Sequence, residues 1–225
     1  MLLMKIPESL AKQGKERIKN YPVEGFVYGE GPDHPVIMLV GEAPGETEIH
    51  NGIPFSGRAG KELMQSLDFL GLTRDDVYIT SAVRSRPYKW GEKKDRKSGE
   101  MIKRKYNRAP TGGEIKAHAP ILDYEVKHVN APIIVTLGNI GLQRLAGKDK
   151  KVTQVHGQLL KQPVQYLENP DAGFKWTEEA YEIFPTFHPA AIFYNRSLDE
   201  KLKEDLVKLK KLIEDRGLKN EQGRT

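Results

Sequence analysis

The sequence predicts an α/β fold built around a parallel sheet. Short apolar runs at 36–40 and 133–137 are typical of strands that are buried on both faces of a sheet. Segments with helical periodicity separate such runs, and this alternation favours parallel strands joined by crossover helices. The 225 residues, 38% of them hydrophobic, show no internal repeat or clear boundary, so we expect a single domain over 1–225. The ends, 1–20 and 217–225, are expected to be peripheral.

The first expected strand, 36–40, runs into a loop rich in glycine and proline at 41–57. An amphipathic helix follows and should end at Gly71, since glycine readily adopts the left-handed conformation found after helices. Its apolar face is formed by Leu63, Leu67 and Leu70. The second strand is expected at 77–80.

A long helix is expected over 110–129. Thr111 and Glu114 have the spacing of a capping box, in which each side chain bonds the backbone N–H of the other residue. The third strand then follows at 133–137, and a helix is expected near 139–146.

Two further strand signals lie at 155–164 and 181–187. The last helix should begin at Ser197, which has Glu200 three residues later in another capping box, and Gly217 should end it. Apolar residues recur along it at helical spacing: Leu202, Leu206, Leu209 and Ile213.

The segment 84–108 carries most of the chain's positive charge. It holds eleven basic and three acidic residues, a net charge of +8, whereas the whole chain has a net charge of +5. Tyr88, Trp90 and Tyr106 are interleaved with the basic residues. Basic and aromatic side chains together favour a nucleic acid, which offers phosphates and stackable bases. A solvated loop that resists aggregation is the alternative.

Several function classes are excluded by composition. The chain has no cysteine, which excludes disulfides, cysteine nucleophiles, and thiolate sites for zinc or iron–sulfur clusters. No apolar run approaches the ~20 residues that span a bilayer, so no membrane association is expected. The start, 1–5, is too short for a secretory signal, so we expect a cytoplasmic protein. No histidine pair has ligand spacing, and we expect no metal; His118 and His128 are expected on the surface.

Polar loops directly follow three of the apolar strands, at 41–45, 81–84 and 188–191. Because ligands bind at the carboxyl ends of parallel strands, Glu42, Ser81 and His188 are expected on one rim of the sheet. A carboxylate and an imidazole in one cleft can orient water, stabilise charge or move a proton. Alternatively, Glu42 braces its loop, and His188 is a turn residue before Pro189.

A set of motifs occurs in order along the chain. Their sequences are GEAPGETE (41–48), GIPFSGRAG (52–60), RP (86–87), NRAP (107–110), LG (137–138), HG (156–157) and PTFHPAA (185–191). Together with Glu114, this set resembles the family 4 uracil-DNA glycosylases over 36–195. The resemblance implies a three-layer uracil-DNA glycosylase-like α/β fold, with a central four-stranded parallel sheet flanked by helices.

The resemblance also implies a reaction. Such enzymes flip a deaminated base out of DNA and hydrolyse its N-glycosidic bond during base excision repair. Glu42 would then position water or steady the cationic sugar, and His188 would stabilise the departing base. Phe55 would stack on the base, and Glu48 would line the side of the pocket that refuses thymine's methyl group. We therefore expect a monomeric glycosylase that acts on DNA containing a deaminated base, without a cofactor.

The expected site has two sets of residues besides the catalytic pair Glu42 and His188. The base pocket would be formed by Ala43, Gly45, Glu48, Phe55 and Ser81. DNA would be contacted by the basic inserted loop 84–108 and by the loops around Pro44 and Pro189. The residues concerned are Pro44, Arg86, Lys93, Lys94, Lys103, Arg104, Lys105, Arg108, Pro189, Ala190, Ala191 and Arg196.

The chain departs from the family pattern in three ways. Ser85 and His118 occupy two positions where the family has cluster cysteines, so we expect no iron–sulfur cluster. Ser81 replaces an asparagine that reads uracil, and a hydroxyl cannot donate and accept as an amide does. Three alternatives therefore follow: the substrate base is uracil, it is another deaminated base such as hypoxanthine, or the protein has lost catalysis. No histidine lies in 84–108, so we expect no covalent DNA complex.

Two alternative functions remain at this stage. One is a non-catalytic DNA-binding protein on the same scaffold, and the other is a hydrolase of a small nucleotide-derived substrate. The basic aromatic segment favours long DNA over a free nucleotide.

Overall fold

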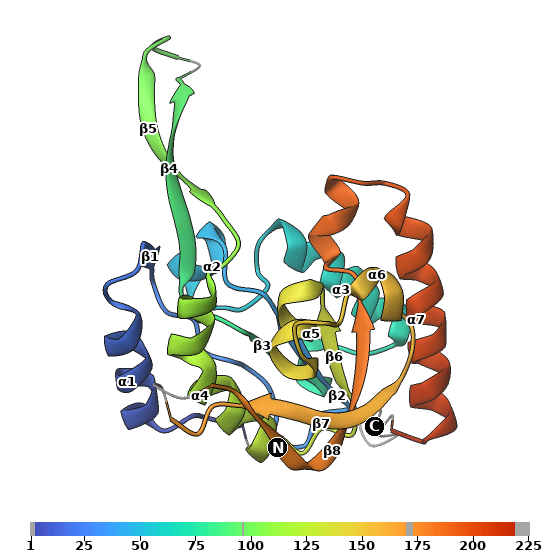
Figure 1. The fold of residues 1–225 in the computed structure, drawn as a ribbon. Coiled ribbons are helices and arrows are strands. Elements are labelled where there is room, and N and C mark those ends of the chain that lie inside the picture. The colour runs from blue at the N-terminus through green and yellow to red at the C-terminus, as the bar shows by residue number, and fades with distance from the viewer. Residues whose placement is uncertain (1–2, 96, 170–172, 219–225) are drawn as a thin grey trace.

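The computed structural model describes residues 3–95, 97–169 and 173–218 and contains a five-stranded sheet (Figure 1). In spatial order the strands are β3 (Val77–Ser81), β2 (Ile37–Gly41), β6 (Ile134–Leu137), β8 (Lys175–Thr186) and β7 (Leu160–Tyr166). The first four run parallel, whereas β7 pairs antiparallel with β8. The expected four-stranded parallel sheet is thus corrected to a five-stranded mixed sheet.

Helices cover both faces of the sheet and form the expected three layers. The longer ones are α1 (Glu8–Ile18), α3 (Arg58–Leu70), α4 (Gly112–His128), α5 (Asn139–Ala146) and α7 (Leu198–Asp215). The side chains of β2 alternate between the two interfaces. Met38 and Val40 pack in one apolar cluster with residues of α1, α4 and α5, whereas Ile37 and Leu39 pack in another with residues of α3 and α7. Burial of both faces explains the continuous apolar run of this strand.

Two of the helix boundaries are confirmed. Helix α3 ends at Gly71, whose φ of +69° lies in the left-handed region that glycine favours. At the start of α4, Thr111 Oγ1 accepts from the N–H of Glu114 at 3.3 Å, and the N–H of Thr111 donates to Glu114 Oε2 at 2.7 Å. The reciprocal capping box therefore forms.

The described part of the segment 1–20 is not peripheral as expected. Ala11 and Ile18 of α1 are buried, and α1 packs closely on α4. A Cβ on Gly14 would lie 2.5 Å from Ile121 Cδ1, so the two helices touch where α1 has no side chain. Of the other expected peripheral end, 219–225 lies outside the described residues.

Two local expectations need correction. The strand expected at 155–164 begins only at Leu160, because a short helix, α6 (Val152–Val155), precedes it. At α7 the expected capping box does not form, since Ser197 Oγ donates to Asn195 Oδ1 at 2.7 Å and makes no cap bond. Local side-chain competition of this kind is common at helix starts.

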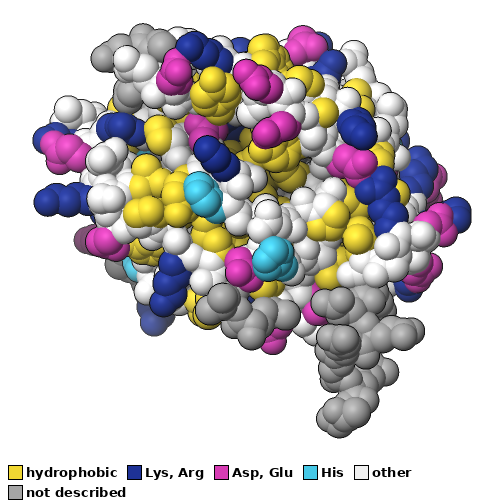
Figure 2. All heavy atoms as spheres, turned by 90° about the horizontal axis from the view of Figure 1, so that it is seen from below, with side chains coloured by type: hydrophobic (Ala, Val, Ile, Leu, Met, Phe, Trp, Pro, Cys, Tyr) yellow, Lys and Arg dark blue, Asp and Glu magenta, His cyan; other side chains and the backbone are white. Residues whose placement is uncertain are grey.

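The basic segment is a β-hairpin rather than an irregular loop. Strands β4 (Arg86–Lys94) and β5 (Met101–Asn107) pair antiparallel, and the short β1 (Val23–Glu24) pairs with the base of β4. Figure 1 shows this hairpin projecting from the body, at the end of the sheet towards which β8 runs. Figure 2 shows the opposite end, where basic and acidic side chains are interspersed.

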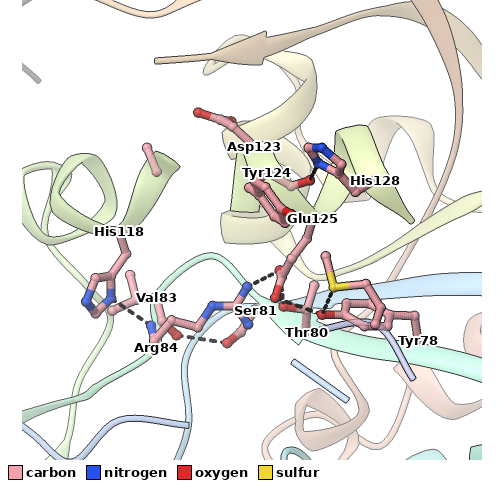
Figure 3. Close-up of polar contacts among 12 residues, drawn as sticks. Tyr78, Thr80, Ser81, Val83, Arg84, His118, Asp123, Tyr124, Glu125 and His128 are labelled. Carbon is pink, nitrogen blue, oxygen red and sulfur yellow. Dashed lines mark hydrogen bonds and ion pairs between the residues drawn. The ribbon is translucent and has the colours of Figure 1, made fainter. Parts of the chain in front are cut away.

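A buried polar network lies beneath the hairpin (Figure 3). Arg84 is 1% exposed and forms an ion pair with Glu125, which also accepts from Tyr78 Oη at 2.9 Å and Thr80 Oγ1 at 2.7 Å. His118, expected on the surface, is wholly buried, and its Nδ1 accepts from the N–H of Arg84 at 2.8 Å. This network ties α4 to β3 and to the start of the hairpin.

Candidate active site

A pocket of about 330 Å³ opens at the carboxyl ends of the parallel strands. Its walls come from the loops after β2 and β8, from the carboxyl end of β3 and from the base of the hairpin. All five residues expected to hold the base line this pocket, together with His188: Ala43, Gly45, Glu48, Phe55 and Ser81. This is the rim at which α/β sheets bind ligands.

Glu42 follows the last residue of β2 and lies next to Ala43, at the edge of the pocket rather than in its lining. Burial raises the pKa of its carboxyl above the usual value. Among the described residues, none donates a hydrogen bond to that carboxylate. Its backbone is held, because the N–H of Val83 donates to the Glu42 carbonyl at 3.1 Å. A partly buried carboxylate without a protein donor is suited to accept hydrogen bonds from water.

His188 begins the short 3₁₀ helix η2 (Pro189–Phe193). Its Nδ1 accepts from the N–H of Ala190 at 3.1 Å, which assigns the ring proton to Nε2. Burial lowers the pKa of the imidazole to about 4, against a smaller opposite effect of the Glu48 charge. At neutral pH His188 is therefore an uncharged hydrogen-bond donor.

Phe55 has a left-handed backbone, with φ of +51°, and it alone does so among the non-glycine residues that the structure describes. Its ring lies 5.7 Å from the His188 ring, centroid to centroid. Two glycines make room for it. A Cβ on Gly41 would lie 2.7 Å from the Phe55 ring, and one on Gly60 would lie 1.9 Å from the Phe55 carbonyl oxygen. Such a strained conformation, held by its surroundings, is typical of functional sites.

Glu48 is the carboxylate that braces the loop. It is 8% exposed, and its Oε2 and Oε1 accept from the N–H groups of Gly45, at 3.1 Å, and Gly57, at 2.8 Å. The loop-bracing role considered for Glu42 therefore falls to Glu48. Through these bonds Glu48 joins the two motif loops that enclose the pocket.

Ser81, the last residue of β3, donates its hydroxyl hydrogen bond to the loop that follows the strand. Ser81 Oγ donates to the carbonyl of Val83 at 2.8 Å. Its lone pairs remain, so towards a ligand this hydroxyl acts as an acceptor.

Comparison with known proteins decides the family. A model described as the uracil DNA glycosylase superfamily matches residues 28–211. The chain belongs to this superfamily. Relatives named type-4 uracil-DNA glycosylase include one from Sulfurisphaera tokodaii, 37% identical over 83% of this chain and 74% of the relative. Another, from Saccharolobus solfataricus, is 34% identical over 83% of this chain and 76% of the relative. A third, from Pyrobaculum aerophilum, is 30% identical over 92% of each protein.

This superfamily member does not fit the iron–sulfur cluster that the resemblance implies for family 4. It has no cysteine at all. Ser85 is buried, and the Nδ1 of His118 already accepts from the N–H of Arg84. In the part of the chain that the structure describes, no group of three or more histidine or carboxylate side chains is placed to hold a metal ion. Nor does any described helix have the length and apolarity needed to cross a bilayer.

The hairpin cations expected to contact DNA differ in how exposed they are in this superfamily member. Lys93, Lys94, Lys103 and Arg104 are exposed on the hairpin. Lys105 is half-buried, forms an ion pair with Glu24, and lies 4.2 Å from the ring centroid of Tyr88.

Arg86 and Arg108 are instead held inside the base of the hairpin. Arg86 is 3% exposed and bonds Glu24 at 2.7 Å, and Arg108 bonds both oxygens of Glu114 at 2.6 and 2.8 Å. This pairing lowers the pKa of Glu114 although burial alone would raise it. These two arginines position the hairpin.

The loop after His188 carries the remaining expected residues. Pro189 is buried, as is Pro44 in the other loop, so both shape their loops. Ala190 and Ala191 are half-buried, and Arg196 is exposed.

Among the pocket-lining residues that sequence reasoning missed, three have side chains that could contact a ligand or DNA: Arg58, Asn107 and Tyr194. Tyr194 is 90% exposed, and Arg58 lies over the Phe193 ring at 3.7 Å from its centroid. Asn107, which the sequence marked only as the first residue of the NRAP motif, lines the pocket from the end of β5. The one signal for Tyr194 was an aromatic residue close after the last motif.

Proposed function

We propose that this protein is a uracil-DNA glycosylase, which hydrolyses the N-glycosidic bond of uracil, or of another deaminated base, in DNA. One observation carries the proposal: a base-sized pocket is lined by Phe55 and a neutral His188, with an unpaired carboxylate, Glu42, at its edge. The superfamily and the names of the relatives support the same reaction. The step belongs to base excision repair.

The base would enter the pocket after leaving the duplex stack. Phe55 offers it a π-face, and such stacking is worth ~1–3 kcal/mol per base. When the glycosidic bond breaks, the base departs with the electron pair as an anion. His188 Nε2–H would donate a hydrogen bond to that anion, and because the imidazole is neutral it polarises the base without carrying a charge.

Glu42 would act on the other fragment. As the bond breaks, the sugar gains positive charge at C1′, and a nearby carboxylate stabilises it. The same carboxylate can accept a proton from the water that adds to C1′, completing the hydrolysis. Burial strengthens both effects because little solvent screens the charge.

We propose that the hairpin and the loop after His188 hold the DNA. The exposed cations of the hairpin suit phosphates, and Trp90, 62% exposed, suits a base or sugar face. Tyr194 lines the pocket from the loop after His188, with the exposed Arg196 two residues further on, and an exposed aromatic ring there can fill the gap left by an extruded base. All the groups come from one chain, which suits a monomer.

An oligonucleotide assay tests the proposal. Labelled single- and double-stranded DNA, with one uracil, hypoxanthine or xanthine, is incubated with enzyme and scored for abasic product. We expect product from uracil, strongly reduced by Glu42→Gln and reduced by His188→Ala, while Glu200→Gln, an exposed carboxylate change on α7, leaves the rate unchanged.

Other outcomes separate the alternatives. Tight, salt-sensitive DNA binding without any abasic product would support a non-catalytic DNA-binding protein. Hydrolysis of free deoxyuridine but not of DNA would support a hydrolase of small nucleotides. Product from hypoxanthine alone would keep the glycosylase reaction and change its base.

A further inference from the structure

The side-chain amide of Asn107 lines the pocket with one end already engaged. Arg86 Nε donates to Asn107 Oδ1 at 2.6 Å. A guanidinium has donors only, so the amide oxygen must face Arg86 and the amide NH₂ must face the other way. Among the described residues, none accepts a hydrogen bond from that Nδ2. A donor pair is therefore free at the pocket wall.

The orientation of this amide is fixed before any ligand binds. Arg86 is buried and cannot turn away, because its Nη1 bonds Glu24 at 2.7 Å and its Nη2 bonds the Lys105 carbonyl at 3.2 Å. Asn107 Nδ2 faces the Gly45 loop, where a Cβ on Gly45 would lie 3.4 Å from it. A preset donor costs no reorganisation on binding.

Ser81 lacks what Asn107 offers. Its hydroxyl proton is used on the Val83 carbonyl, so Ser81 presents only an acceptor to a ligand. The pairing edge of uracil has an N3–H donor between two carbonyl acceptors. Recognition of that edge needs one acceptor and at least one donor in the protein. Ser81 supplies only the acceptor.

We propose that Ser81 and Asn107 together read the base, and that Asn107 is a specificity-determining residue of this glycosylase. Ser81 Oγ accepts from N3–H, and Asn107 Nδ2 donates to an adjacent carbonyl oxygen, leaving the other carbonyl to His188. Cytosine has an acceptor at N3 and an amino donor beside it, so both contacts would set like groups against each other. The inference rests on the proposed function, because it assigns the base contacts of that reaction.

Asn107→Asp is the sharpest test. The carboxylate keeps the shape and the acceptor for Arg86 but replaces the NH₂ donor by a second acceptor. The probes are single-stranded oligonucleotides with one 2′-fluoro-2′-deoxyuridine or 2′-fluoro-2′-deoxycytidine, since the fluorine disfavours the cationic sugar and blocks cleavage. We expect the wild type to prefer the uracil probe, and Asn107→Asp to reduce this preference at least about tenfold, as expected when a hydrogen-bond donor is lost and its partner unpaired. Any general repulsion of DNA by the new charge lowers both affinities and cancels in the ratio.

Rescue provides the second readout. Asn107→Ala should slow single-turnover uracil excision about tenfold, and adding Ser81→Asn should restore it, because one amide at position 81 can donate and accept. Circular dichroism melting checks that the hairpin base stays folded in each variant. If Asn107→Asp and Asn107→Ala match the wild type in probe preference and excision, the inference is wrong while the proposed function stands. If the wild type neither prefers the uracil probe nor excises uracil, both fail.

Discussion

Glu42 and His188 differ in what burial does to them. Burial raises the pKa of the Glu42 carboxyl and lowers the pKa of His188 to about 4, so each is driven towards its neutral form. At neutral pH His188 is uncharged and suits an anionic base, and the ionised form of Glu42 suits a cationic sugar.

The acid limb of the pH–rate profile should therefore belong to Glu42. Protonation removes its charge, so single-turnover uracil excision should fall as the pH drops towards a pKa above the usual value for glutamate. His188 stays neutral down to about pH 4 and should not contribute above that pH. Rates from pH 4 to 9 test this. An unchanged acid limb in Glu42→Gln, seen in its residual rate, would assign the limb to another group.

The ring of Phe55 should contribute to uracil excision by stacking on the base. Phe55→Ala should lower uracil excision by roughly 5- to 150-fold, the equivalent of ~1–3 kcal/mol of base stacking. The matched control is Phe69→Ala, on the exposed face of α3 with 45% exposure, which should leave the rate unchanged. Single-turnover excision rates measure the effect, and melting temperatures check that both variants fold. An equal loss of rate in Phe55→Ala and Phe69→Ala would contradict the stacking role.

At the scale of elements, the hairpin divides into a tip and a base. The tip carries exposed cations, of which Arg104 also pairs with Glu46 of α2 (Glu46–Asn51) at 3.0 Å, whereas Arg86 and Arg108 at the base pair with Glu24 and Glu114. Surface pairs are worth little, but pairs with a buried partner fix geometry and are costly to break. The tip of the hairpin can thus contact DNA, while the ion pairs at the base of the hairpin fix the direction in which the hairpin projects.

Changing the four tip cations to glutamine should weaken DNA binding. The residues are Lys93, Lys94, Lys103 and Arg104. Affinity should fall on all sequences alike, and the slope of log K against log salt should flatten by about one for each phosphate that the protein no longer neutralises. The control changes four exposed lysines of α1 and α7, Lys12, Lys201, Lys203 and Lys211. A salt slope that flattens as much in the control would refute a specific role for the hairpin.

The elements show which parts of the fold could be predicted from the sequence. Gly71 and the Thr111–Glu114 capping box are local signals and were predicted correctly. Strand β7 lies at the sheet edge and mixes polar with apolar residues, and α1 has few apolar ones. The antiparallel pairing of β7 and the packing of α1 depend on partners elsewhere in the chain, which local patterns do not reveal. The same holds for the site. The loops that carry the motifs line the pocket, whereas the burial of Arg86 depends on Glu24, 62 positions away.

At the scale of the whole molecule, one buried histidine joins three elements. His118 of α4 accepts from the backbone of Arg84, lies 5.7 Å edge-on from the Phe26 ring, and would be 3.3 Å from a Cβ on Gly14 of α1. Burial and the nearby Arg84 charge lower its pKa to about 3, so it is neutral in the folded protein.

Stability should therefore fall in acid partly through His118. An unfolded histidine binds its proton below about pH 6.5, whereas folded His118 does so only near pH 3. In that window the unfolded state binds more protons, so the free energy of unfolding decreases as the pH falls. His118→Gln keeps an acceptor for Arg84 and cannot titrate, so its unfolding free energy should fall less between pH 7 and 4. Urea titrations at each pH measure the difference, and parallel curves would contradict the assignment.

The position of Asn107 on the hairpin has an evolutionary consequence. Tyr88 pairs with Asn107 at the foot of the hairpin, so the chain leaves and re-enters the body at neighbouring points. A segment attached in this way can lengthen, shorten or be exchanged without rebuilding the sheet. Yet the last residue of the exchanged piece, on our proposal, also contacts the damaged base. Selection for DNA affinity would then also act on base specificity. The two properties would therefore change together whenever this segment is exchanged.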